Sequence, residues 1–153
     1  MPTIDTFVLD WRGDQVAERT IRCTALAMDG LMADCVVTAK GRVPRKTAIL
    51  QGGIQMRPTV RSGNNLTGYW GVFSVKYARW VEEGTQAHVI LPKTGWGLPG
   101  GEKKALFWPG ADHPVRMVWH PGTKSRPYLV PTALEKYPSL PLRIRAELEW
   151  GTK

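Results

Sequence analysis

Residues 14–40 read DQVAERTIRCTALAMDGLMADCVVTAK, and this segment sets the architecture of the chain. Its apolar side chains recur at alternating spacings of four and three residues, which places them on one stripe of a helix. They are Ile21, Ala25, Met28, Met32, Cys35 and Ala39. Gly13-Asp14 supplies an N-cap, and Gly41 followed by Pro44 supplies a stop. We therefore predict one long helix over residues 14–40, packed by its stripe on the rest of the fold.

The residues after Pro44 change to short β-prone runs separated by turn residues. Such runs are typical of antiparallel strands, and they span residues 53–60, 66–75, 88–91, 105–108 and 115–119. The segment Ser62-Gly63-Asn64-Asn65 suits a hairpin connection between the first two. The fold class we expect is α+β, with the long N-terminal helix on a small antiparallel sheet within residues 53–119.

A short helix and a long arm are expected within the β-rich part. Tyr77, Trp80 and Val81 stand at i, i+3 and i+4, which favours a helix of about two turns over residues 77–84. Residues 91–112 contain many Gly and Pro residues. We predict a long mobile arm or hairpin there.

The C-terminal segment, residues 127–150, is predicted to be helical. Pro138 and Pro141 break it, so we expect one interrupted helix or two short ones. With 153 residues, of which 42% are hydrophobic, the chain is long enough for a single domain with a modest core.

The sequence shows no sign of export or of a membrane. No apolar run approaches the roughly 20 residues that span a bilayer, and the N-terminus lacks the basic-then-apolar order of a secretory signal. Cys23 and Cys35 would point about 120° apart on the long helix, so we expect no disulfide. We expect synthesis in a cytoplasm and no membrane partner.

The net charge of +8 is concentrated in one segment. Residues 35–81 contain eight basic residues and no acidic residue. The rest of the chain holds 13 basic and 13 acidic residues, so its charges balance. Such a segment attracts phosphate, or it is merely a solvated face. The residues that could face DNA or an acidic partner are Lys40, Arg42, Arg45, Lys46, Arg57 and Arg61.

No motif predicts a catalytic, metal or cofactor site. Residues 95–100, GWGLPG, match the dinucleotide pattern G-x-G-x-x-G, but no apolar-periodic helix follows and no βαβ unit surrounds them. The residues that could hold a metal show no ligand spacing; they are His88, His113, His120 and Asp112. We expect no enzyme activity and no cofactor.

Two features favour contact with another subunit. Glu82-Glu83 ends the predicted short helix, where the macrodipole disfavours negative charge, so a basic partner is expected: Arg126 or a residue of a neighbouring subunit. The chain also has seven tryptophans, which a small domain rarely buries completely and which are enriched at interfaces. Burial of most of them in the core is the alternative.

Three stretches together resemble one protein family. They are YARWVEEGT at residues 77–85, AHVILPK at 87–93 with KKALFW at 103–108, and HPGTKSRPYLVPTALE at 120–135. Their order and spacing are similar to those of the small neck or tail-completion proteins of lambda-like tailed phages, typified by the tenth gene product of a lambdoid phage. The resemblance covers roughly residues 40–135.

This resemblance implies a structural protein of the virion, present in the host cytoplasm during assembly. Such a protein forms a ring of identical subunits, a hexamer or a dodecamer, at the head-tail junction or the head-proximal end of the tail. Its implied partners are portal, adaptor, stopper, tail-terminator and tail-tube proteins, together with genomic DNA, contacted without sequence preference. The motif residues that could form its interfaces are Tyr77, Trp80, Glu82, Glu83, Gly84, Thr85, His120, Pro121, Gly122, Arg126, Pro127 and Tyr128.

Two other function classes stay open at this point. A nucleic-acid-binding module would use the basic residues of residues 35–81 and would bind with a steep salt dependence. A small metal-dependent hydrolase would use the three histidines and Asp112.

Overall fold

The long helix α1 (Gly13–Arg42) organises the first part of the molecule. A computed structural model describes residues 12–44, 48–92 and 105–150. In it α1 has 30 residues, about 45 Å at 1.5 Å per residue, and runs without a break through Gly30. It ends where Val43 turns to an extended conformation before Pro44. The predicted helix is confirmed within two residues at each end.

Two compact units are distinguished by contacts between Cα atoms. The helical unit comprises Met1–Val75 and Tyr128–Lys153, and the arm unit comprises Lys76–Pro127. The expectation of a single domain stays a prediction.

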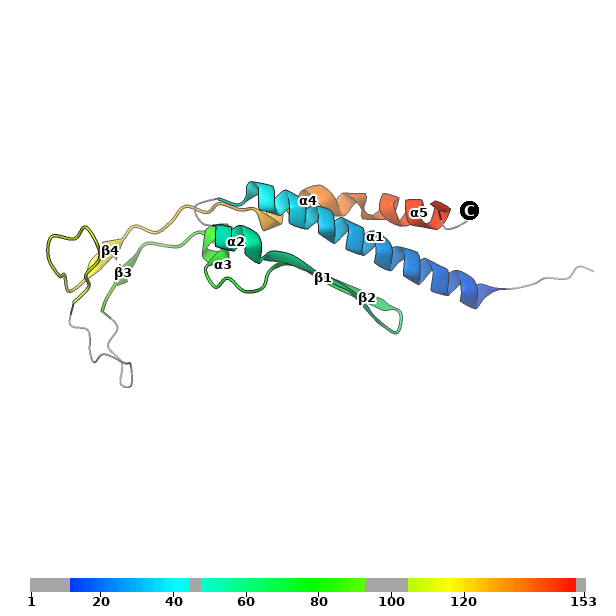
Figure 1. The fold of residues 1–153 in the computed structure, drawn as a ribbon, viewed down its shortest axis with the longest axis horizontal. Helices are drawn as coiled ribbons and strands as arrows, with labels where there is room; N and C mark the ends of the chain where they lie inside the picture. Colours follow the sequence, from blue (N-terminus) through cyan, green and yellow to red (C-terminus); the bar gives the residue numbers. More distant parts are fainter. Residues whose placement is uncertain (1–11, 45–47, 93–104, 151–153) are drawn as a thin grey trace, which may run out of the picture. The chain divides into compact units, whose positions relative to one another are not determined.

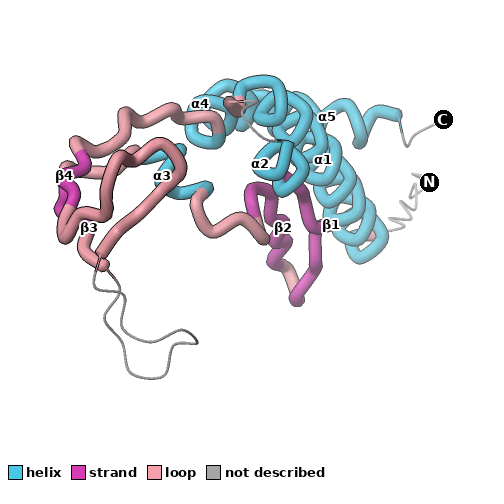
Figure 2. The backbone as a smooth tube through the Cα atoms, turned by 60° about the vertical axis from the view of Figure 1, so that its left-hand side comes forward, coloured by secondary structure: helices cyan, strands magenta, loops and turns pink. Residues whose placement is uncertain are grey.

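In the helical unit, α1 lies between a β-hairpin and the C-terminal helices (Figures 1 and 2). The hairpin consists of β1 (Ile54–Ser62) and β2 (Asn65–Val72), and the short helix α2 (Ala48–Gly53) precedes it. The C-terminal elements are α4 (Leu129–Lys136), the 3-10 turn η1 (Tyr137–Ser139) and α5 (Leu140–Trp150). The interrupted C-terminal helix is therefore as predicted, whereas α2 was not predicted.

The buried face of α1 differs in part from the predicted stripe. Met32, Cys35 and Ala39 are buried as expected, whereas Ile21, Ala25 and Met28 of the predicted stripe are only half-buried. Cys23, Ala27 and Leu31 are buried in addition. The second set arises because α5 packs along one side of α1 while the hairpin packs on another. Most of these residues are small, which lets α1 approach both neighbours closely.

A β-bulge joins the hairpin to α1. The register of β1 and β2 shifts between Arg57 and Val60, a stretch that contains Pro58, which has no N–H to donate. The N–H of Thr59 leaves the ladder and donates to Asp29 Oδ1 at 2.8 Å. Asp29 of α1 thus accepts the backbone hydrogen bond that β2 would otherwise accept.

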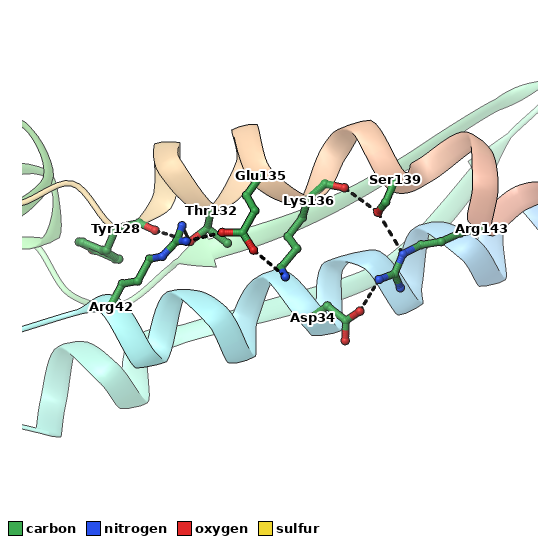
Figure 3. A network of polar contacts seen from close by, with 8 residues as sticks. All are labelled: Asp34, Arg42, Tyr128, Thr132, Glu135, Lys136, Ser139 and Arg143. Atoms are coloured by element: carbon green, nitrogen blue, oxygen red, sulfur yellow. Dashed lines mark hydrogen bonds and ion pairs between the residues drawn. The ribbon is translucent and has the colours of Figure 1, made fainter.

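Polar contacts clamp α1 to the C-terminal helices (Figure 3). Arg42 pairs with Glu135 and donates to Thr132 Oγ1 at 3.1 Å, and Arg143 pairs with Asp34. Glu135 also pairs with Lys136 at 2.8 Å. The α4 side chains that bind Arg42 are therefore polar.

The arm unit contains α3 (Ala78–Glu83), β3 (His88–Ile90) and β4 (Val118–His120). The expected short helix and the α+β class are confirmed. The expected strands do not form one sheet, because the described residues hold two separate two-stranded sheets, β1–β2 and β3–β4. Of the predicted strand at 105–108, only Leu106 pairs, in an isolated bridge with Val115. Most of the predicted mobile arm, at 93–104, lies outside the described residues.

Among the described residues, no helix combines the length and the apolar character that crossing a bilayer requires.

Candidate assembly site in the arm unit

A pair of Gly-Thr dipeptides closes the base of the arm. Thr85 and Thr123 face each other in an antiparallel bridge, with N–H···O distances of 3.0 and 3.1 Å between their backbones. Their hydroxyl oxygens lie 3.0 Å apart, and Thr85 Oγ1 also accepts from the N–H of Thr123 at 3.0 Å. We call the four residues Gly84, Thr85, Gly122 and Thr123 the Gly-Thr clasp.

Both glycines of the clasp are required by its geometry. Gly84 has φ +76, and a Cβ there would lie 2.5 Å from the carbonyl oxygen of Thr123. Gly122 has φ +88, and a Cβ there would lie 2.3 Å from the carbonyl oxygen of Thr85. Each glycine therefore lets the opposite threonine approach closely. A side chain at either position would push apart the two chain segments that carry Gly84-Thr85 and Gly122-Thr123.

The clasp also fixes the short helix α3. The N–H of Gly84 donates to the Trp80 carbonyl at 2.9 Å and ends the helix, and the N–H of Arg126 donates to the Val81 carbonyl at 2.8 Å. Glu83 pairs with Arg79, four residues earlier, at 2.8 Å. The basic partner expected for Glu83 therefore lies within α3, and Arg126 contributes its backbone N–H.

The residues of the Gly-Thr clasp pair in the same register as strands β3 and β4. The bridge Thr85–Thr123 and the pairs His88–His120, Val89–Trp119 and Ile90–Val118 keep the same offset along the two legs. Residues 84–90 and 118–123 thus form a two-stranded ribbon, which we call the arm ribbon.

The two histidines of the arm ribbon have structural hydrogen bonds. His120 Nδ1 accepts from the N–H of Gly122 at 3.0 Å, and His88 Nδ1 lies 2.9 Å from the Gln86 carbonyl oxygen. Their ring centroids are 5.1 Å apart. In the described part of the chain, no three His, Cys, Asp or Glu residues gather to hold a metal, so Asp112 and His113 do not complete a site with this pair.

An open pocket lies beside the clasp. Its lining includes Arg79, Trp80, Glu83 and His88. Arg79 and Glu83 are paired with each other at 2.8 Å.

One face of the arm ribbon is apolar and exposed. Val89 and Trp119 pair on it, and Leu91 and Met117 are the residues that directly follow β3 and precede β4. Trp119, Leu91 and Met117 are each more than 60% exposed. Ala78 is the single buried hydrophobic residue that the described residues of this unit contain. The described residues of the arm unit thus contain almost no fully buried core, and several of their large apolar side chains are exposed.

The remaining motif residues surround this framework. Tyr77 and Trp80 are exposed on and before α3, Pro121 and Pro127 are exposed beside the clasp leg, and Tyr128 is buried where the helical unit begins again. The structure thus joins Gly84, Thr85, His120, Gly122 and Arg126 into one framework.

Four of the six predicted basic residues lie in the described part of the chain, on α1 and β1. Arg42 pairs with Glu135 near the end of α1, whereas Arg61 pairs with Glu18 near its start, about 36 Å away along the helix. Arg57 lies over the Phe73 ring at 4.4 Å. Lys40 is in the last turn of α1, and Arg45 and Lys46 lie outside the described residues.

No family model, curated protein or solved structure matches this chain. The family resemblance therefore rests on the quoted stretches alone.

The sequence did not show that the two Gly-Thr dipeptides contact each other. Gly84, Thr85 and Gly122 were predicted as separate motif residues, and Thr123 was not among them. The available signal was the dipeptide Gly-Thr, which stands once in each of the two best-matching stretches.

Proposed function

We propose that this protein is a structural component of a tailed-phage particle, a neck or tail-completion protein that acts as a ring of identical subunits. It joins tail to head, surrounds the path of the DNA and has no chemistry of its own. The ring has six subunits, or twelve where it adjoins the portal.

The Gly-Thr clasp is the observation that carries this proposal. The two stretches with the strongest family resemblance are separated by 34 residues, yet their Gly-Thr pairs interlock within one framework. That framework holds the exposed side chains of Val89 and Trp119. An element of this kind suits assembly, because large exposed apolar patches mark protein interfaces.

The basic segment supports a limited role toward DNA. Two of its arginines, Arg42 and Arg61, are committed to carboxylates of the same chain. Phosphate contact through Lys40, Arg57 and the residues at 45–46 would position DNA without reading its sequence. This is weaker support for a free nucleic-acid-binding module than the sequence offers.

Light scattering coupled to size exclusion, together with electron microscopy, tests the ring. The expected result is a species of six or twelve copies of the 17.1 kDa chain, seen as rings end-on. A monomer at every concentration, also in the presence of neck partners, contradicts the proposal.

A fluorescence titration with double-stranded DNA separates the two function classes. A neck protein is expected to bind weakly at physiological salt and without sequence preference. Tight binding by the monomer, lost steeply as salt rises, would favour the nucleic-acid-binding module instead. Portal or capsid genes upstream and a tail-tube gene downstream are the expected genetic neighbours.

A further inference from the structure

The hairpin β1–β2 has one face on α1 and one face turned away from it. A Cβ at Gly68 would lie 2.6 Å from Met32 Cε, so Gly68 marks the face that packs on the helix. Its neighbour Tyr69 points to the opposite face, because successive strand residues alternate. Tyr69 is 59% exposed, and Phe73, which directly follows β2, is 43% exposed. The outward face of the hairpin therefore presents two aromatic rings.

An arginine joins these two rings on the outward face. Arg57 is opposite Tyr69 in the register of the hairpin, where side chains stand about 5 Å apart. The guanidinium carbon of Arg57 lies 4.4 Å from the centre of the Phe73 ring, at which distance a cation is attracted to the electrons of the ring. Phe73 thus holds the guanidinium group beside Tyr69. We call Arg57, Tyr69 and Phe73 the hairpin platform.

The hairpin platform carries a positive charge. Residues 48–75 contain two arginines and no Asp or Glu. Arg61 pairs with Glu18 of α1. Among the described residues, Arg57 has no carboxylate partner and contacts the Phe73 ring. The charge of Arg57 therefore remains available to an anionic partner.

We propose that the hairpin platform binds unpaired bases of single-stranded DNA. Proteins hold single strands by stacking the bases on aromatic rings and guanidinium planes, while basic groups meet the phosphates. One base stacks on Tyr69 and a neighbouring base on the guanidinium group that Phe73 holds. The inference goes beyond the proposed function, because it requires no ring and names a contact with bases, not with phosphates alone.

The spacing of the hairpin platform fits two separate bases. Tyr69 and Phe73 are four residues apart, roughly 14 Å in an extended chain, so the two rings do not compete for one base. Stacking needs neither a particular base nor a 2′-hydroxyl group. The platform should therefore bind DNA without sequence preference.

Other anionic partners would leave the rings unused. The bases of a duplex are stacked on one another and reach a protein ring only when they are flipped out. An acidic protein surface would pair with Arg57 but does not present the succession of planar groups that a single strand offers. Unpaired bases use all three side chains of the platform.

Fluorescence anisotropy with labelled strands tests the hairpin platform in the full chain. The probes are a short oligothymidylate, an abasic strand of the same length and charge, an oligouridylate and a DNA duplex. Oligothymidylate should bind most tightly, and its affinity should depend only weakly on salt, because few phosphates are neutralised. Equal binding of the abasic strand would show a contact with phosphates alone, which overturns the proposal. Tighter binding of oligouridylate or of the duplex also overturns it, and binding of none of the probes points to a protein partner.

Two substitutions separate stacking from charge. Tyr69→Leu keeps an apolar side chain and should lower the affinity for oligothymidylate at least about fivefold. Arg57→Lys keeps the charge but not the planar group, and it should lower this affinity as well. Binding of the abasic strand should change little in both. Val60→Thr is the matched control, because Val60 is 67% exposed on β1 and offers neither a ring nor a charge. Unchanged binding of oligothymidylate in both variants overturns the proposal.

Photo-cross-linking of the wild type locates the contact without any substitution that could disturb folding. An oligothymidylate that carries thiothymidine is irradiated in the presence of the full chain. The expected cross-links lie in peptides of residues 54–62 and 65–73. Cross-links confined to α1 or to the arm unit overturn the proposal. None of these outcomes bears on the ring, which light scattering tests separately.

Discussion

At the scale of single residues, the close contacts of the Gly-Thr clasp define what each position tolerates. Gly122 combines a left-handed backbone with a carbonyl oxygen at 2.3 Å from the site of a Cβ. Gly110 has a similar φ of +93 but nothing within 4 Å of such a Cβ. An alanine at Gly110 therefore adds backbone strain alone, whereas an alanine at Gly122 adds backbone strain and a steric clash.

Gly122→Ala is expected to open the base of the arm, whereas Gly110→Ala should cost only the backbone strain of about 1 kcal/mol. Hydrogen exchange at the amides of Thr85 and Thr123 measures the difference. Faster exchange at both amides in Gly122→Ala, with little change in Gly110→Ala, is the expected pattern. Equal exchange in the two variants would show that the clasp adapts to a side chain.

Glu135 makes the clamp between α1 and α4 sensitive to acid. Hydrogen bonds from Lys136 and then Arg42 lower the pKa of its carboxyl group below the ordinary 4.5. A carboxyl group with a lowered pKa in the folded state stabilises the protein above its unfolded pKa, and this contribution is lost as the pH falls through the folded value. We expect Glu135→Gln to be less stable than the wild type near neutral pH and to lose less stability below about pH 4.5. Urea unfolding at a series of pH values tests this, and parallel pH profiles would contradict it.

The ion pairs of Arg42 and Arg61 could not be predicted from the sequence. Arg42 and Arg61 stand in a segment without acids, and their partners Glu135 and Glu18 lie 93 and 43 residues away. A count of charge along the chain detects the excess but not these distant carboxylates. The sequence therefore did not show that two of the six basic residues are paired within the chain, and the basic surface stays a prediction.

At the scale of elements, the bulge in β1 depends on a side chain of α1. The N–H of Thr59 has Asp29 Oδ1 as its acceptor, and a Cβ at Gly68 on β2 would lie 2.6 Å from Met32 Cε of α1. This links the position of the hairpin along α1 to one carboxylate.

Asp29→Ala should destabilise the helical unit by about 1–3 kcal/mol, because the Thr59 N–H loses its acceptor. Asp29→Asn keeps an oxygen acceptor and should lose clearly less. Thermal unfolding of both variants tests this, with an expected fall of about 2–4 °C per kcal/mol for a chain of this length. Two equal falls in melting temperature would show that the charge of Asp29, and not its hydrogen bond, matters.

The sequence predicted elements with a strong local signal and missed those that depend on tertiary contacts. The period of α1, the turn at Gly63-Asn64 and the prolines after α4 are local signals, and the structure follows them. The helix α2 has six residues, two of them glycine, and no periodic pattern announces it. Strand alternation indicates strands but not their partners, so the separation of β1–β2 from β3–β4 could not be anticipated.

At the scale of the whole molecule, buried apolar residues are distributed unevenly. Nearly all of the buried hydrophobic residues belong to the helical unit, around α1 and the start of the hairpin. The described residues of the arm unit bury only Ala78. Local stability should therefore differ between the units.

Hydrogen exchange of the free chain should be slowest in the middle of α1, around Leu31 to Cys35, and fast in β3 and β4. On assembly, the amides of β3 and β4 should become strongly protected while those of α1 change little. Mass spectrometry of peptides from the single chain and from the ring measures both. Uniform protection in the single chain would mean that the arm unit is stable without a partner.

The single register of the arm ribbon has a mechanical consequence. A force that separates the two legs sideways loads one row at a time, and it must first break the contacts between Thr85 and Thr123 if it acts at the base. A force along the ribbon loads all the paired rows together, because every row resists the same sliding motion. The arm ribbon is therefore opened more easily by peeling its legs apart at the base than by sliding one leg past the other.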